Sequence, residues 1–343
     1  MNDNPRDPLS RPRIVLAMIP GLEQSLFSAE HLAALRSMAT LPETEPVLPF
    51  ESERAGRLLE DAEILLTGWG CPEISAAVLD RAPRLRLIAH CAGTVKEMVT
   101  PACWERGLRV ITAAEANAIP VVEYTVAAIL LANKHAFHIR EIYRQERRYG
   151  LWHHTTPGIG NLNKRVGIVG ASRIGRRLIE ALRPFDFSVC VYDPYLSEEE
   201  AARLGVEQVE LDELLRSSDV VTLHAPSLPE TRHMIGAREL ALIPDGAALI
   251  NTARGALIDG AALEKELSTG RIRAVIDTTD PETLPADSPL YDLPNVFLTP
   301  HIAGTSGTEV YRMADLVIEE IGRYLRGEPL QHEVRQEDFS RIA

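Results

Sequence analysis

The stretch from Arg165 to Gly175 constrains the fold of this chain more than any other. It begins with a short apolar run, residues 166–169, which has the length of a buried parallel strand. Gly170 then makes a tight turn, and apolar residues at helical spacing continue to Arg183. A strand, a glycine turn and a helix in this order form the unit in which a dinucleotide pyrophosphate binds to the N–H groups of a helix N-terminus.

The glycine turn departs from the dinucleotide fingerprint at Ser172, where a glycine is usual. The added Cβ would hold the phosphates away from the backbone, while the hydroxyl group can donate to them. Asp193 ends the next predicted strand, 18 residues after Gly175, where an acid that binds a ribose 2′-hydroxyl is expected. The alternative is an ordinary turn that binds no nucleotide, and Asp193 makes that alternative less favourable.

Composition argues against some partners. The net charge is −13 and the basic residues are scattered, so we expect no surface that neutralises nucleic-acid phosphates. Residues 1–12 form a polar tail without an apolar leader segment, and no run reaches the roughly 18 apolar residues that span a membrane. We therefore expect a cytoplasmic protein with neither a nucleic-acid nor a membrane partner.

Histidine and cysteine spacing predicts no metal site. His153 and His154 are adjacent, but no third ligand follows at a metal-like spacing, so we expect a solvated or interface pair. The cysteines form neither a CxxC pair nor a zinc pattern with histidine. We expect buried reduced thiols at Cys71, Cys91, Cys103 and Cys190.

Short apolar runs alternate with helical patterns along the chain, which predicts an α/β fold with two Rossmann-like parallel-sheet domains. Strands of the first domain are predicted at 13–18, 62–67, 85–89 and 108–112, and strands of the second at 166–169, 188–192, 219–223, 247–251, 273–276 and 296–299. The longest helical pattern, residues 117–149, has Pro120 near its start and is apolar almost all round. It predicts a helix buried between layers or in a subunit interface.

Three polar residues, Arg254, Glu282 and His301, follow predicted strands of the second domain. Because the carboxyl ends of parallel strands meet at one edge, we expect them at the edge where the nucleotide binds. Arginine offers a fork for a carboxylate, histidine transfers a proton near neutral pH, and a carboxylate orients the imidazole. Singly, each residue has an ordinary alternative: a surface arginine, a loop charge or a core histidine. Together with a nicotinamide, the set predicts hydride transfer between a 2-keto and a 2-hydroxy acid.

Two turns of the first domain are open to more than one interpretation. Ala92, Gly93 and Thr94 follow a predicted strand, where an open sheet offers backbone N–H groups to a ligand. A plain turn is the better interpretation of these residues taken alone. Trp69 follows another predicted strand and either lines a pocket or caps the core.

The sequence resembles the D-isomer-specific 2-hydroxyacid dehydrogenases, which include phosphoglycerate dehydrogenases, glyoxylate/hydroxypyruvate reductases and D-lactate dehydrogenases. The resemblance covers roughly residues 13–330, and its motifs occur in the family's order and spacing. These motifs are residues 166–175, Tyr192-Asp193-Pro194-Tyr195, residues 224–231, Asn251-Thr252-Ala253-Arg254-Gly255 and residues 298–304.

The resemblance implies an NAD-dependent D-2-hydroxyacid dehydrogenase with the two-domain organisation of the family. Residues 1–113 and 303–343 would form a substrate domain completed by the C-terminal helix, and residues 114–302 an NAD-binding Rossmann domain. Arg254 would hold the substrate, His301 would be the acid/base and Glu282 its partner, while Ala92, Gly93 and Thr94 would bind the substrate carboxylate. Cofactor-binding positions would be Gly170, Ser172, Arg173, Ile174, Gly175, Asp193, Ala225, Pro226, Thr252, Ala253, Asp277 and Gly304. Family members are usually homodimers, which would use the helical pattern at 117–149.

The sequence departs from the family pattern at two loops. Lys96 follows Thr94 and Val95 where the family often has an aspartate, so the substrate side chain stays open. Residues 278–282 read Thr-Thr-Asp-Pro-Glu where Val-Phe-Glu is commoner, and the offset from Asp277 favours Glu282 over Asp280 as the partner of His301. The sequence ends at Ala343, so we expect no additional C-terminal regulatory domain of the kind that some phosphoglycerate dehydrogenases carry.

Two other functions remain open at this point. The first is an NAD(H)-sensing protein with little turnover, as in corepressors related to the family, with which Ser172 is consistent. The intact set of Arg254, Glu282 and His301 argues against it. The second is oxidation of a non-carboxylate donor, such as formate or phosphite, on the same fold.

Overall fold

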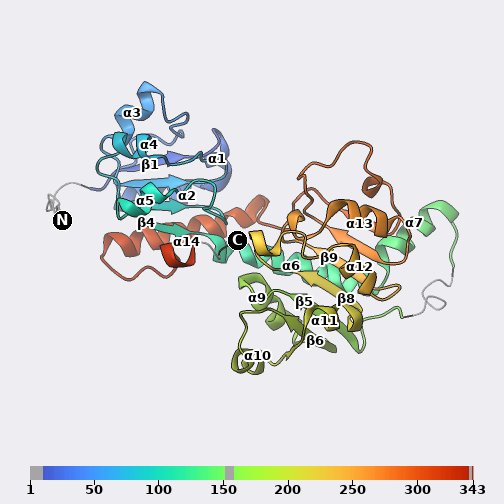
Figure 1. Ribbon diagram of the computed structural model, residues 1–343. Coiled ribbons are helices and arrows are strands. Elements are labelled where there is room, and N and C mark those ends of the chain that lie inside the picture. Colours follow the sequence, from blue (N-terminus) through green and yellow to red (C-terminus); the bar gives the residue numbers. More distant parts are fainter. Residues whose placement is uncertain (1–10, 151–157, 340–341, 343) are drawn as a thin grey trace. The chain divides into compact units, whose positions relative to one another are not determined.

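The computed structural model describes residues 11–150, 158–339 and 342 of the chain (Figure 1). The chain folds into two compact units. The first unit comprises residues 1–117 and 305–343, and the second comprises residues 118–304. The sequence placed these divisions at 113/114 and 302/303. His153 and His154 lie outside the described residues, as does most of the predicted tail.

The sheet of the first unit is built from short apolar segments that are buried along almost all of their length. Its parallel strands are β1 (Ile14–Ala17), β2 (Ile64–Thr67), β3 (Leu87–His90) and β4 (Arg109–Thr112), in that order. The two-residue strand β12 (Glu333–Val334) pairs antiparallel with β4. Apolar runs without alternation are typical of strands that are covered on both faces.

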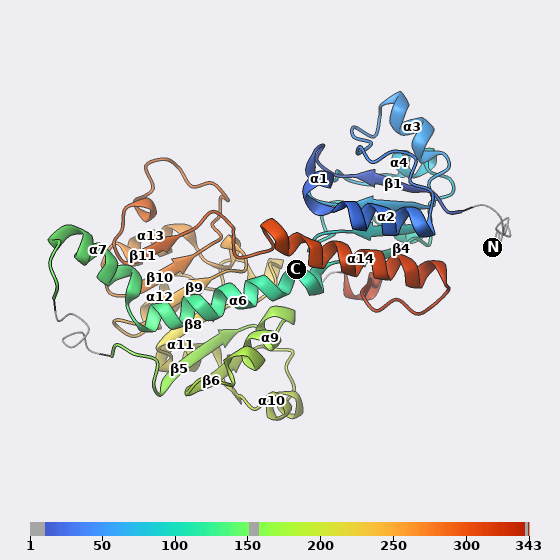
Figure 2. The ribbon, with the colours of Figure 1, turned by 180° about the vertical axis from the view of Figure 1, so that it is seen from behind.

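Helices cover both faces of this sheet. On one face lie α3 (Glu53–Leu59), α4 (Ala76–Arg81) and α5 (Pro101–Glu105), and on the other α1 (Leu22–Leu26), α2 (Ala29–Met38) and α14 (Val310–Leu325). Figure 2 shows α2 and α14 side by side. Because Met313, Val317 and Ile321 of α14 pack into the same apolar cluster as β1, the C-terminal helix completes this unit, as expected.

The second unit has a seven-stranded parallel sheet in the order β11-β10-β9-β8-β5-β6-β7. The strands are β5 (Lys164–Val169), β6 (Phe187–Tyr192), β7 (Glu207–Gln208), β8 (Val220–Leu223), β9 (Ala248–Asn251), β10 (Arg273–Ile276) and β11 (Val296–Leu298). One face carries α6 (Ala114–Asn133), which begins in the first unit, α9 (Arg173–Leu182) and α10 (Glu198–Leu204). The other carries α11 (Leu211–Ser217), α12 (Ala237–Leu242) and α13 (Gly260–Leu267). The prediction of two parallel-sheet domains is confirmed.

The single helix predicted at residues 117–149 is wrong. The segment forms two helices, α6 and α7 (Ala136–Glu146), because His135 adopts a left-handed conformation with φ 50° that interrupts the helical bonding. Since α6 begins at Ala114, Pro120 also lies inside the helix and not at its start. A proline there removes one backbone hydrogen bond, which the burial of the surrounding apolar side chains offsets.

Helix α6 is long and apolar enough to cross a membrane by composition alone. Val122, Ala128 and Ile129 instead pack into the apolar cluster of the second unit, so the described contacts are those of a core helix.

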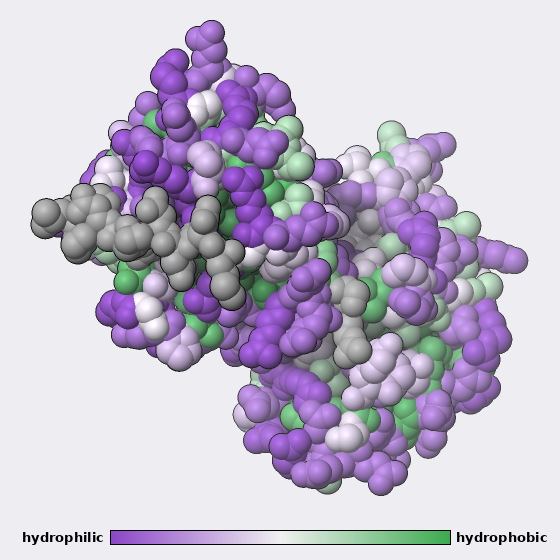
Figure 3. Space-filling view, turned by 60° about the vertical axis from the view of Figure 1, so that its left-hand side comes forward, coloured by the Kyte–Doolittle hydropathy of each residue, from purple (hydrophilic) through white to green (hydrophobic). Residues whose placement is uncertain are grey.

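Hydrophilic side chains predominate on the face seen in Figure 3. The four cysteines are free and buried, as expected.

Candidate active site

The glycine turn after β5 is as tight as a dinucleotide site requires. Gly170 has φ +100°, and a Cβ there would meet the backbone nitrogen of Ala225 at 2.5 Å. A Cβ on Gly175 would lie 2.1 Å from the carbonyl oxygen of Gly170. Only glycine fits either position, because the clashing atoms belong to the backbone. These close contacts bring the start of α9 against the carboxyl ends of β5 and β8.

Ser172, the departure from the fingerprint, is the N-cap of α9. Its Oγ accepts a hydrogen bond from the Gly175 N–H at 3.4 Å, and the helix therefore begins at Arg173. Among the described residues, the N–H groups of Ser172 and Ile174 have no protein acceptor. A helix start with such N–H groups and a positive dipole end fits the pyrophosphate of NAD.

Asp193 lies at the end of β6, beside the glycine turn. One carboxylate oxygen accepts the Ala171 N–H at 2.7 Å, and the other accepts the Tyr195 N–H at 2.8 Å. These bonds fix the carboxylate next to the start of α9. Each carboxylate oxygen has a second lone pair, so Asp193 retains acceptor capacity for a ribose hydroxyl.

The turn that carries Arg254 is shaped by Asn251, whose role the sequence analysis missed. The Asn251 side chain donates to the Arg254 carbonyl at 2.9 Å and accepts the Ala253 N–H at 3.1 Å. Gly255 follows, and a Cβ there would meet the Thr279 carbonyl carbon at 2.0 Å. The turn of half-buried Arg254 therefore packs directly on the loop that leads to Glu282.

Asp277 organises the turn that carries His301. Its buried carboxylate accepts hydrogen bonds from the Thr299 hydroxyl at 2.6 Å, the Ile302 N–H at 2.8 Å and the Ala303 N–H at 2.9 Å. The family resemblance implies Asp277 as a cofactor-binding position. The described contacts of its side chain are all with the 299–303 segment.

His301 and Glu282 are brought together by these two loops. The Nδ1 atom of His301 lies 2.5 Å from Oε1 of Glu282, and both side chains are exposed enough to meet a ligand. Because a carboxylate only accepts, Nδ1 carries the proton of this bond and Nε2 is left for the reaction. Asp280 instead pairs with Arg232 at 3.2 Å, so Glu282 is the residue beside the imidazole.

Polar side chains of α6 reach the same edge of the second unit. The Tyr124 hydroxyl lies 2.8 Å from Thr299 Oγ1, and Thr125 Oγ1 lies 3.0 Å from Thr252 Oγ1. Neither residue was predicted from the sequence, although two adjacent polar residues in an apolar helix are a usable signal. Other expected cofactor positions at this edge are Ala225, Pro226, Thr252 and Ala253 after β8 and β9, and Gly304 after β11.

The expected substrate loop belongs to the first unit and follows β3. The Thr112 hydroxyl contacts the carbonyl oxygens of Ala92 at 2.9 Å and Gly93 at 2.5 Å. In the described chain, the N–H groups of Ala92, Gly93 and Thr94 have no protein acceptor. The loop thus holds its carbonyls inward and keeps consecutive N–H donors for an anion.

Two buried histidines predict acid sensitivity. Burial lowers the pKa of His224 to about 3, and lowers the pKa of His90 to about 4 against the opposing effect of a hydrogen bond to Thr94. Between those values and about 6.5 the unfolded chain binds more protons than the folded chain, so the free energy of unfolding falls as pH falls. We expect up to ~1.4 kcal/mol per pH unit per histidine, measured by urea denaturation between pH 7.5 and 5. In the His224→Asn variant the free energy of unfolding should depend less steeply on pH. If its pH dependence equals that of the wild type, His224 is not a source of the acid sensitivity.

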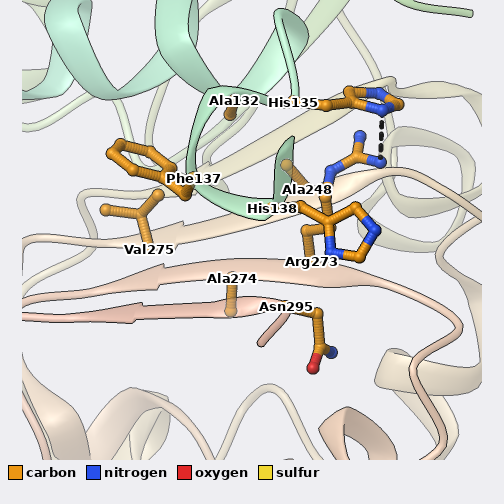
Figure 4. A pocket seen from close by; sticks show the side chains of 9 residues that line it. All are labelled: Ala132, His135, Phe137, His138, Ala248, Arg273, Ala274, Val275 and Asn295. Atoms are coloured by element: carbon orange, nitrogen blue, oxygen red, sulfur yellow. Dashed lines mark hydrogen bonds between the residues drawn. The ribbon is translucent and has the colours of Figure 1, made fainter. Parts of the chain in front are cut away.

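Two cavities of the second unit lie at different edges of its sheet. The cavity in Figure 4, lined by His135, His138 and Arg273, has a volume of about 10 Å³. It lies beside the start of β10 and holds at most one water molecule, so neither a dinucleotide nor a keto acid fits. A cavity of about 210 Å³ instead borders the turns after β9 and β10, where Gly255 and Asp280 line it.

This chain is similar in sequence to a family model and to several curated dehydrogenases. A family model described as "D-isomer specific 2-hydroxyacid dehydrogenase, NAD binding domain" matches residues 126–303. The chain is 34% identical over 301 residues to a D-3-phosphoglycerate dehydrogenase of Methanocaldococcus jannaschii, covering 87% of this chain and 56% of that protein. It is 34% identical over 266 residues to a glyoxylate reductase of Korarchaeum cryptofilum, covering 77% of this chain and 80% of that protein. The chain spans about half the length of the curated phosphoglycerate dehydrogenases it matches.

Solved structures share the fold. The crystal structure of the TT0316 protein from Thermus thermophilus has 30% identity and a TM-score of 0.75, with 94% of this chain and 100% of that chain covered. The structure of a D-2-hydroxyisocaproate dehydrogenase has 23% identity and a TM-score of 0.76, with 94% and 99% covered, and shows the fold alone.

Proposed function

The chain belongs to the D-isomer-specific 2-hydroxyacid dehydrogenase family, and on this premise we propose that it is an NAD(H)-dependent oxidoreductase that interconverts a 2-keto acid and a D-2-hydroxy acid. The observation that carries the proposal is the 2.5 Å contact between His301 and Glu282, on the sheet edge where the glycine turn ends β5. An oriented imidazole at the nucleotide edge is the group that carbonyl reduction needs.

In the proposed mechanism, NADH supplies the hydride when bound. The backbone N–H groups of Ser172 and Ile174 hold its pyrophosphate. Glu282 orients His301, which donates a proton from Nε2 to the carbonyl oxygen as negative charge develops there. Arg254 offers its guanidinium fork to the carboxylate and carbonyl oxygens of the keto acid. In the reverse direction His301 accepts the hydroxyl proton.

The loop after β3 of the first unit is, taken by itself, a further candidate site for a carboxylate. The consecutive N–H groups of Ala92, Gly93 and Thr94 are donors of the right kind for a carboxylate. Thr112 fixes the loop through the carbonyls of Ala92 and Gly93, so the donors are oriented before the acid arrives.

The decisive experiment is a panel of glyoxylate, hydroxypyruvate, pyruvate, phenylpyruvate and 2-ketoglutarate with NADH, followed by nicotinamide absorbance. Turnover of at least one acid is expected. No turnover of any acid, despite measurable NADH binding, would favour the NAD(H)-sensing alternative. That alternative was supported by the serine at position 172 in place of a glycine. Because the Ser172 hydroxyl caps α9, this serine has a structural role and supports the alternative less.

Asp193 predicts a preference for NADH over NADPH. Its carboxylate is fixed by two backbone N–H groups and cannot move away from a 2′-phosphate, which would meet like charge. We expect kcat/KM to be at least ~10-fold higher with NADH, corresponding to ~1.4 kcal/mol. The Asp193→Asn variant should lower the ratio of kcat/KM with NADH to kcat/KM with NADPH. A higher kcat/KM with NADPH in the wild-type protein would contradict the assignment.

We further propose a cytoplasmic homodimer that binds neither nucleic acid nor membranes. The exposed helix α7, on which Phe137 stacks against Phe297 with ring centroids 4.1 Å apart, is the segment we expect a second copy to cover. Tyr143 is exposed on the same helix. Light scattering after size-exclusion chromatography measures the state directly.

A further inference from the structure

Two adjacent hydroxyl side chains interrupt the apolar surface of helix α6. Tyr124 and Thr125 both belong to the second unit, and the proposed mechanism uses neither of them. The Tyr124 hydroxyl lies 2.8 Å from Thr299 Oγ1, and Thr125 Oγ1 lies 3.0 Å from Thr252 Oγ1. Successive side chains of a helix diverge by about 100°, so the two hydroxyl groups reach the ends of different strands.

The two partners of these hydroxyl groups stand at corresponding places in the site. Thr252 follows β9 and comes two residues before Arg254, and Thr299 follows β11 and comes two residues before His301. Strands β9 and β11 flank β10 in the sheet, so their ends lie about 10 Å apart. Helix α6 therefore contacts both of the turns that carry residues of the proposed chemistry.

Asp277 fixes the direction of the hydrogen bonds that begin at Tyr124. A carboxylate can only accept, so the Thr299 hydroxyl donates its one proton to Asp277 Oδ1 at 2.6 Å. The Thr299 oxygen is then left to accept, and the Tyr124 hydroxyl is its donor. Burial raises the pKa of Tyr124, the hydrogen bond to Thr299 lowers it, and the charge of Asp277 raises it, so the phenol keeps its proton and remains a donor.

This chain of hydrogen bonds ends on the backbone around His301. The Asp277 carboxylate accepts the N–H groups of the two residues that follow His301, at 2.8 and 2.9 Å. The His301 N–H itself donates to the Asp277 carbonyl oxygen at 2.8 Å. Because His301 has φ 54°, a conformation that non-glycine residues seldom adopt, its turn depends on such contacts. Tyr124 supports the turn at Thr299, where the turn begins.

Thr125 acts as an acceptor for the neighbouring turn. Its hydroxyl donates to the Val121 carbonyl at 2.7 Å within α6, so the Thr252 hydroxyl is the donor of the bond between the two threonines. Both threonine side chains are buried, so water does not compete for this bond. The bond holds the start of the turn that leads to Arg254.

We propose that Tyr124 is a positioning residue for the reaction, and that its hydroxyl group, acting through Thr299 and Asp277, holds the turn from which His301 transfers the proton. Thr125 holds the Arg254 turn through Thr252 in the same manner. The inference rests on the proposed function for the reaction and adds the helix that sets the places of its two principal residues. The role of Tyr124 is indirect, because its hydroxyl acts on Thr299 and not on the reacting atoms.

The first test is the Tyr124→Phe variant, which keeps the ring and removes the donor. We expect kcat for keto acid reduction to fall ~10-fold, while KM for the acid and NADH affinity stay within about twofold, because the misplaced group is the proton donor. Tyr311→Phe on α14 of the first unit is the matched control, since it removes the same hydroxyl group from a tyrosine that is 38% exposed. An unchanged kcat in Tyr124→Phe overturns the inference.

The second test asks whether Tyr124 acts through Thr299. Thr299→Ser keeps the hydroxyl group and should retain most of the wild-type kcat, whereas Thr299→Val removes it and should lower kcat. Adding Tyr124→Phe to Thr299→Val should then change kcat by less than ~2-fold, because the interaction is already lost. A further ~10-fold loss in the double variant would mean that Tyr124 acts by another route, and it would overturn the inference.

The third test needs no turnover. Hydrogen exchange followed by mass spectrometry reports the protection of backbone N–H groups in residues 299–304. We expect exchange in this segment to be at least ~5-fold faster in Tyr124→Phe than in the wild type, and unchanged in Tyr311→Phe. If the wild type reduces no keto acid but exchange is faster in Tyr124→Phe, the proposed function fails and the support of the His301 turn by Tyr124 stands. Unchanged exchange in Tyr124→Phe overturns the inference and leaves the proposed function intact.

Discussion

Replacement of His301 by asparagine is expected to lower kcat for keto acid reduction by ~10²–10⁴-fold while NADH affinity stays within about twofold. The imidazole is the proton donor beside Glu282, and an amide cannot take its place. Asparagine tolerates the left-handed backbone of His301, whose φ is 54°, so the turn itself should persist. Steady-state kinetics by nicotinamide absorbance and NADH fluorescence titration measure the two quantities.

His233 offers a matched control for this experiment. It is a partly exposed histidine of the second unit with φ 53°, and its Nδ1 lies 3.9 Å from Asp259. His233→Asn repeats the same chemical change at the same backbone conformation, on a side chain that faces Asp259 and not Glu282. It should leave kcat within about twofold. Wild-type turnover in His301→Asn would end the assignment of His301 as the acid/base.

Replacement of Asp277 by alanine is expected to reduce the free energy of unfolding by ~3–5 kcal/mol and to lower kcat strongly. The buried carboxylate accepts two backbone N–H groups and one hydroxyl group, all from residues 299–303. Its loss leaves these donors unpaired next to His301. Urea denaturation measures the first effect, and turnover at saturating substrate measures the second.

Asp280 provides the control for Asp277. It is three residues away, and its ion pair with Arg232 is partly exposed, so Asp280→Ala should cost less than ~1 kcal/mol. If Asp277→Ala is no more destabilising than Asp280→Ala, the carboxylate does not hold the His301 turn. An Asp277 variant that loses stability but retains kcat would separate its structural role from the proposed chemistry.

The sequence predicts most of the strands well, because strands depend on local apolar patterns, while the roles of the site residues stay predictions. The apolar run before Gly170 and the polar residues after later strands are visible without a fold. The antiparallel strand β12 was missed because two residues carry no periodicity, and its pairing with β4 joins positions more than 200 residues apart. Short helices α1, α5 and α12 were missed for the same lack of pattern.

The roles of partner groups were harder to predict. The resemblance implied Asp277 as a cofactor-binding position, which stays a prediction, and the folded chain adds its hydrogen bonds to the 299–303 segment. Asn251 and Tyr124 act through partners that only the folded chain brings near. The break at His135 also escaped prediction, because helical spacing continues on both sides of it.

The chain leaves the first unit at residue 117 and returns to it at residue 305, which has a consequence for biosynthesis. Strands β1 to β4 are synthesised early, but the apolar face that Met313, Val317 and Ile321 cover must wait for α14 to leave the ribosome. The second unit is contiguous and can complete its sheet before then. We therefore expect the inserted unit to mature first on the nascent chain, with the earliest strands exposed and dependent on chaperones until the final helix docks.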